Sequence, residues 1–172
     1  MSENFYLTGE GVSDAKPYPY RSCGLDGIFL LNGYEVREHD GERHVFIRDI
    51  DELHLAIGRH LVTSRKSLAP KEVRFLRKTM DMSQAELAHV LGNTSESVAR
   101  WEKGESDIPG PAEKLLRAYF IARSVLDSSD LETLRTLLVE GLAELDAIDE
   151  LQLRPVQFRL TNHWAEIDSK AA

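Results

Sequence analysis

The chain has 172 residues, of which 42% are hydrophobic and 29% charged, so it is long enough for one ordinary domain or two small ones. The net charge of −8 argues against a protein that coats nucleic acid without selectivity, and the single cysteine excludes an internal disulfide framework. The sequence opens without a basic and apolar leader and has no apolar run of membrane-spanning length, so we expect a cytoplasmic protein without a membrane partner.

The N-terminal residues 1–20 combine Gly, Ser, Asp and two prolines without a helical period, which predicts a flexible arm. Its aromatic residues either stay in this tail or dock on the next segment. From residue 24 to 49, β-rich runs flank Asp40-Gly41, a strong hairpin signal. Asn32-Gly33 marks a possible earlier turn, which would give three short strands in place of two.

A helical period returns over residues 50–62, where Leu53, Ile57 and Leu61 recur at a spacing of four. We therefore predict that residues 21–65 form a small α+β unit of a β-hairpin and a helix. Such a unit is too small to be very stable alone.

A second helix is predicted over residues 68–80, because Pro70 suits a first helical turn and Val73, Leu76 and Met80 form an apolar stripe. Basic residues lie beside this stripe. Between residues 65 and 120 they slightly outnumber the acidic residues, whereas the acidic excess of the chain lies on either side.

The next stretch, MSQAELAHVLGNTSESVARWEKG, predicts two short helices joined by a tight turn. Ser83 and Glu86 have the spacing of a capping box, and Gly92-Asn93 can stop the first helix in a left-handed conformation. Thr94 can cap the second helix, in which Val98 and Trp101 face inward. The outward positions are polar or basic, as contact with base edges and phosphates requires: Ser95, Glu96, Ser97, Arg100 and Lys103.

The segments SQAELAHVLG and TSESVARWEKG resemble the helix-turn-helix of the Xre/Cro family, whose pattern is Ser-Gln-x-x-Leu-Ala followed by a polar helix ending in Arg-aromatic-Glu-Lys-Gly. The resemblance covers residues 68–120 and implies a five-helix, lambda-repressor-like domain over residues 66–126. It also implies that Arg77 pairs with Glu102. The fold class is therefore mostly α, with the α+β unit before the helix-turn-helix domain and an acidic helix after it.

Two further helices are predicted toward the C-terminus. After a loop marked by Pro109, Gly110 and Pro111, an amphipathic helix is predicted, with apolar positions at Leu115, Leu116, Tyr119, Phe120 and Val125. Residues 127–153 are acidic, with leucines at helical spacing at positions 131, 134, 138, 142 and 145. This helix would serve either dimerisation or a partner protein, or else close the core of the monomer. The remainder of the 127–172 segment is predicted to be a tail, in which VQFRL alternates like a short strand and Trp164 has no obvious partner.

Matching the family's pattern suggests a role for each candidate DNA-binding residue. Gln84 would lie at a phosphate or base edge, and Ser83 and Lys103 would contact phosphates. Thr94, Ser95, Glu96 and Ser97 would line the major groove, where Arg100 is the best candidate for binding a base. These roles predict a sequence-specific transcriptional regulator, a repressor, which binds the major groove of a palindromic double-stranded DNA operator as a homodimer.

The order of hairpin, helix and helix-turn-helix also resembles the MqsA type of antitoxin, whose N-terminal unit is a zinc ribbon with two Cys-x-x-Cys pairs. Only Cys23 is present here, so we expect neither metal nor another cofactor. The resemblance gives an alternative function, an antitoxin that binds a toxin protein and regulates its own operon. The flanks contain no nucleophile elbow, phosphate loop or His-x-x-x-His helix, so we do not expect an enzyme.

Overall fold

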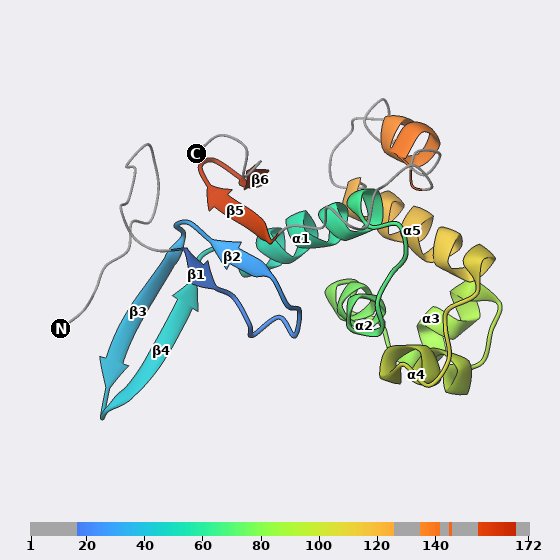
Figure 1. The fold of residues 1–172 in the computed structure, drawn as a ribbon, viewed down its shortest axis with the longest axis horizontal. Helices are drawn as coiled ribbons and strands as arrows, with labels where there is room; N and C mark the ends of the chain where they lie inside the picture. The colour runs from blue at the N-terminus through green and yellow to red at the C-terminus, as the bar shows by residue number, and fades with distance from the viewer. Residues whose placement is uncertain (1–16, 126–134, 142–144, 146–154, 168–172) are drawn as a thin grey trace. The chain divides into compact units, whose positions relative to one another are not determined.

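The computed structural model describes residues 17–125, 135–141, 145 and 155–167, and the account below is confined to them. The chain divides into two compact units (Figure 1): unit 1 combines residues 1–56 with 154–172, and unit 2 comprises residues 57–153. The boundary falls within helix α1 (Ile50–Ser64), which begins in unit 1 and ends in unit 2. Of the helices in the described ranges, none combines the length and apolar character that a bilayer crossing requires.

Unit 1 contains two sheets. The first has the strand order β1-β2-β5-β6, with the bounds β1 (Tyr18–Pro19), β2 (Ile28–Leu30), β5 (Val156–Leu160) and β6 (Trp164–Ile167). Its central pair, β2 with β5, is parallel, and its outer pairs are antiparallel. The second sheet is an antiparallel hairpin of β3 (Tyr34–His39) and β4 (Glu42–Ile47).

Two turns predicted from the sequence organise the strands before α1. Asp40 and Gly41 have φ angles of 52° and 79°, the left-handed pair that a two-residue hairpin turn requires. Asn32-Gly33 separates β2 from β3, with a φ of 74° at Gly33. The alternative with three short strands is therefore confirmed.

The strand prediction for VQFRL is also confirmed, but its pairing with β2 has no local signal in the sequence. The buried amide of Asn32 donates to the Leu160 carbonyl and accepts from the Leu160 N–H, both at 2.7 Å, as a strand backbone would. Trp164 is buried above Gly33, and its indole N–H donates to the Arg48 carbonyl at 2.9 Å. The C-terminal strands thus complete a sheet that the N-terminal residues begin.

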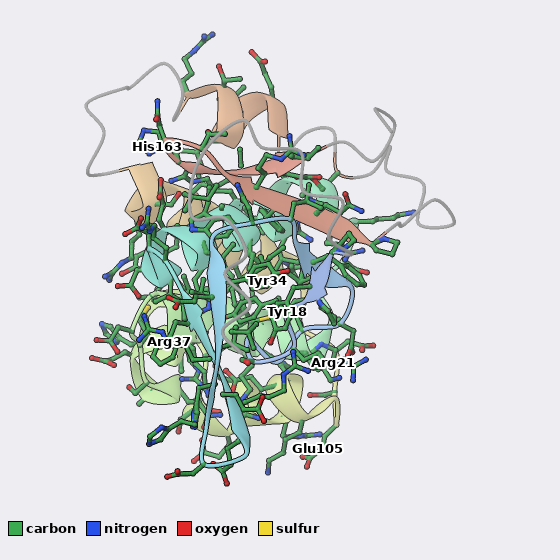
Figure 2. The ribbon with its side chains drawn as sticks, turned by 90° about the vertical axis from the view of Figure 1, so that its left-hand side faces the viewer. Tyr18, Arg21, Tyr34, Arg37, Glu105 and His163 are labelled. Carbon is green, nitrogen blue, oxygen red and sulfur yellow. The ribbon has the colours of Figure 1, made fainter. Side chains whose placement is uncertain are left out.

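The prediction of a flexible arm over residues 1–20 is wrong for residues 17–20, part of which form strand β1. Tyr18 lies in β1, and its ring centroid is 4.8 Å from that of Tyr34. Figure 2 labels the two neighbouring side chains. Tyr20 is buried, and its hydroxyl lies 2.8 Å from His54 Nε2. Burial of these aromatic rings against unit 1 outweighs the lack of a regular period in their sequence. Residues 1–16 of the arm lie outside the described residues.

Unit 2 contains the end of α1 and the predicted helix-turn-helix. Its further elements are α2 (Pro70–Thr79), α3 (Gln84–Leu91), α4 (Ser95–Lys103), α5 (Gly110–Val125) and a short π-helical segment, η1 (Leu137–Gly141). Helix α4 packs against α2 and α3, and α5 contacts α3 and η1 (Figure 1). The side chains at 0% or 1% exposure in this unit include Ile57, Leu61, Val62, Val73, Leu76, Leu87, Val98, Leu116, Phe120 and Ile121. A small strand unit and a helix-turn-helix domain therefore agree with the coarse fold prediction.

The buried face of α5 differs from the predicted one. Leu115 is 44% exposed, whereas Arg117 is fully buried. Arg117 forms an ion pair with Glu113 and donates to the Leu61 and Val62 carbonyls near the end of α1. Because the guanidinium satisfies those carbonyls and the carboxylate neutralises it, this cation is accommodated inside the unit.

The predicted acidic helix over residues 127–153 lies mostly outside the described residues. Within it, η1 covers Leu137–Gly141 and the side chain of Leu145 is buried. Positions 131, 134 and 142 of its predicted leucine stripe are among those outside.

Candidate nucleic-acid interface

Helix α3 begins with the predicted capping box. Ser83 has an extended backbone, and its hydroxyl accepts a hydrogen bond from Glu86 N–H at 3.2 Å. In return, the Glu86 carboxylate accepts from the Ser83 N–H at 2.7 Å. These hydrogen bonds, above all the one from the backbone, lower the pKa of the Glu86 carboxyl. Two otherwise unpaired N–H groups are satisfied, which holds the first helix of the pair in place.

The turn between α3 and α4 requires a left-handed residue. Gly92 has φ 64° and ψ 35°, and its N–H reaches the carbonyls of Ala88 and His89. Thr94 then caps α4, because its hydroxyl accepts from Ser97 N–H at 3.2 Å. The left-handed turn at Gly92 and the cap at Thr94 were both predicted from the sequence, and both are confirmed.

Helix α4 has one buried and one outward face. Val98, Trp101 and Glu102 are buried, so the prediction that Trp101 belongs to the core is confirmed. The outward face consists of the five predicted residues: Ser95, Glu96, Ser97, Arg100 and Lys103. Glu96, Arg100 and Lys103 are exposed, whereas Ser95 and Ser97 are half-buried.

A polar network fixes α4 against the preceding helices. Arg77 on α2 donates to both carboxylate oxygens of Glu102, at 2.6 and 2.9 Å, and its third contact is with the Met82 carbonyl at 2.7 Å. Gln84, the first residue of α3, donates to Glu102 at 2.9 Å. The Arg77–Glu102 pairing that the resemblance implied is confirmed.

This network also determines the ionisation of Glu102. Burial alone would raise the pKa of its carboxyl, but the hydrogen bonds from Arg77 and Gln84, together with the positive charges of Arg77 and Arg74, outweigh burial and lower that pKa below its ordinary value. The bidentate geometry combines charge with directionality, so the carboxylate positions α4 relative to both α2 and α3.

Residues 73–121 match the family model described as helix-turn-helix. The match runs from within α2 to within α5 and so contains the complete α3–α4 pair. Neither the curated proteins nor the solved structures gave a match. The match supports a helix-turn-helix domain and, with it, a DNA-binding regulator.

The eight predicted site residues occupy two places in the helix-turn-helix domain. Ser83 and Gln84 lie at the start of α3, whereas Thr94, Ser95, Glu96, Ser97, Arg100 and Lys103 lie on α4 or at its cap. The predicted role of Gln84 at a phosphate or base edge stays a prediction, and its amide N–H already binds Glu102.

Sequence reasoning did not single out Glu105 next to this site. The Lys103 ammonium lies 3.8 Å from the Glu105 carboxylate, and both side chains are more than half exposed. Such an exposed pair is weak, so Lys103 can exchange this partner for a phosphate. The opposite charges two residues apart were the only signal in the sequence.

Two residue types that can bind metals, the thiol of Cys23 and the imidazole of His54, make other contacts in unit 1. The Cys23 thiol donates to the Tyr20 carbonyl at 3.3 Å, and burial raises the pKa of this thiol. His54 binds the Tyr20 hydroxyl, and burial lowers the pKa of its imidazole. Across the part of the chain that the structure describes, no three His, Cys, Asp or Glu side chains group as metal ligands would.

Proposed function

We propose that the protein is a sequence-specific transcriptional regulator that places α4 in the major groove of double-stranded DNA. The observation that carries this proposal is the outward face of α4, which is polar or charged throughout and lies opposite a buried face anchored by Trp101. A helix with one buried face and one exposed polar face can pack against its own domain and contact a DNA duplex at the same time. The helix-turn-helix match over residues 73–121 supports the same function.

The outward residues divide into two roles. Arg100 binds a base, since a guanidinium matches the O6 and N7 acceptors of guanine with two hydrogen bonds. Lys103 and Ser83 bind phosphates, which fixes the register of the helix without discriminating between sequences. The remaining hydroxyls, those of Thr94, Ser95 and Ser97, lie at the N-terminal end of α4, which is also the end that attracts anions.

We further propose that the protein acts as a homodimer on a palindromic operator and represses transcription. One helix reaches only a few base pairs, so useful selectivity requires two copies of it. Leu115 on α5 is an exposed apolar side chain in the helix-turn-helix unit. Occupancy of an operator is sufficient for repression, whereas activation needs an additional surface that recruits the transcription machinery.

A groove of about 580 Å³ between α3 and α5 supports pairing with a second copy. Its lining combines apolar side chains with both signs of charge: Met80, Asp81, Met82, Ala85, Glu86, His89, Val90, Tyr119 and Arg123. In a two-fold pair, the acidic groups of one copy can face the basic groups of the other.

The exposed Leu115 offers a test of the homodimer. Leu115→Asp should shift the dimer toward monomer in sedimentation, with Lys114→Asp as the matched control on the same helix.

Selection of bound duplexes from a random DNA pool tests the proposed function. We expect an inverted repeat whose half-sites are centred about 10 base pairs, or one helical turn, apart. Enrichment of no sequence would contradict sequence-specific binding. Enrichment of a single unrepeated half-site would contradict only the homodimer.

The second candidate function, an antitoxin, is favoured by one feature of unit 1. Phe46 on β4 is 52% exposed, and the Arg37 guanidinium lies 4.9 Å from its ring centroid. Figure 2 shows Arg37 on the same hairpin. Aromatic and arginine side chains frequently anchor protein interfaces. If the neighbouring reading frame encodes a toxin, co-expression of this protein should relieve growth arrest, and Phe46→Ala should weaken the relief.

A further inference from the structure

Glu96 is the one acidic residue on the outward face of α4, and around the helix axis it lies in the middle of that face. With about 100° of rotation per residue, positions i, i+4 and i+7 lie on one side of a helix. Glu96, Arg100 and Lys103 have this spacing, and all three are exposed. They lie opposite Val98, which is fully buried. A molecule that contacts Arg100 on α4 therefore also lies next to Glu96.

The carboxylate of Glu96 is stabilised in its ionised form. Its own backbone N–H and the hydroxyls of Thr94 and Ser95, all at the start of α4, favour the carboxylate and lower its pKa. The positive end of the helix dipole acts in the same direction. At neutral pH this side chain is therefore an anion that can accept hydrogen bonds and donate none.

An anion in this position restricts which DNA groups can lie next to it. Phosphates and the acceptor atoms O6, N7 and O4 of the bases repel it. The amino groups in the major groove are favourable partners, and a carboxylate pairs in particular with N4 of cytosine. Glu96 thus weakens binding to DNA in general and strengthens binding only where an amino group is present.

We propose that Glu96 is a specificity-determining residue that selects a cytosine in each half-site of the operator. This inference rests on the proposed function, because it requires α4 to lie in the major groove. Four residues of helix advance about 6 Å, which is one or two base-pair steps of about 3.4 Å. The cytosine selected by Glu96 therefore lies one or two steps from the guanine that Arg100 binds.

Selection from a random DNA pool, carried out with the wild-type chain and two variants, tests this inference. The wild type should prefer cytosine at one position by about fivefold or more. Glu96→Gln should move that preference toward adenine, since an amide pairs with the N6 and N7 atoms of adenine. Glu96→Ala should remove the preference at that position and raise the affinity for unselected DNA.

Glu105→Gln is the matched control, because it removes the same charge from an exposed residue beyond the end of α4. It should leave the base preference unchanged. An enriched motif that is identical for the wild type and Glu96→Gln would overturn the inference and leave the proposed function standing. If the wild type enriches no motif at all, the proposed function fails, and this inference fails with it.

Discussion

Arg77 and Glu102 are 25 residues apart in the sequence, yet two hydrogen bonds of 2.6 and 2.9 Å join their side chains between α2 and α4. Glu102 is buried on the inner side of the helix whose outer side bears Glu96 and Arg100. The pair therefore connects the stability of the domain to the orientation of its candidate DNA-binding face.

Removal of one member of this pair should destabilise unit 2. Arg77→Ala or Glu102→Ala leaves a largely buried, unpaired charge, which typically costs about 3–5 kcal/mol. Urea unfolding measures the loss, and a double-mutant cycle isolates the pairwise contribution. Single variants whose unfolding midpoints match that of the wild type would contradict the structural role of the pair.

The same pair predicts a pH dependence. The pKa of Glu102 is lower in the folded protein than its ordinary value of 4.5. A lowered pKa contributes stability that is present above the ordinary value and is lost as the pH falls through the folded one. Wild-type unit 2 should therefore lose stability below about pH 4.5, and Glu102→Gln should lose less over that range. Equal losses of stability in the wild type and in Glu102→Gln would show that other carboxylates cause the pH dependence.

Gly58 should not tolerate alanine, although alanine favours helices by about 1 kcal/mol. A Cβ atom at this position of α1 would meet Cζ of Phe120 at a separation far below van der Waals contact. We expect Gly58→Ala to lower the thermal midpoint, and Phe120→Leu to recover part of the loss in the double variant. A midpoint raised by Gly58→Ala would contradict the packing of α1 on α5.

Trp164 should be essential for unit 1. Its ring lies so close to Gly33 that a Cβ there would come within 2.5 Å of it. Trp164→Ala should cost about 3–5 kcal/mol, the usual penalty for removing a large buried side chain. Hydrogen exchange should show faster exchange in β2 and β5, while α3 and α4 keep their protection. Trp164→Phe, which keeps a ring but loses the hydrogen bond to Arg48, should have a smaller effect.

The helix-turn-helix was predictable because its signals are local. The Ser83–Glu86 capping box, the left-handed Gly92 and the cap at Thr94 each involve residues within four positions of one another. The Arg77–Glu102 pair is not local, and only the resemblance to a known family made it predictable.

Unit 1 was less predictable because its contacts join distant segments. Asn32 and Leu160 are 128 residues apart, and no periodicity indicates that their backbones and side chains pair. Trp164 likewise shows no partner in its own segment. Arg117 was missed for a different reason, since hydropathy places an arginine at the surface unless its carbonyl and carboxylate partners are known.

Arg100 should determine selectivity without affecting the fold. It is exposed on α4, so Arg100→Ala should leave the unfolding midpoint nearly unchanged. Loss of a bidentate base contact should cost about 1–3 kcal/mol of discrimination between the selected duplex and a scrambled one. Lys114→Ala removes the same charge from α5 and should preserve the discrimination. Equal discrimination by wild type and Arg100→Ala in a gel-shift titration would remove Arg100 from the base-binding role.

The central claim, that α4 is the surface that meets DNA, is tested most directly by an NMR titration of the ¹⁵N-labelled chain with the selected duplex. We predict that the largest backbone shift changes fall at Ser83, Gln84 and residues 94–103. Changes confined to unit 1, with α4 unaffected at saturation, would contradict the claim.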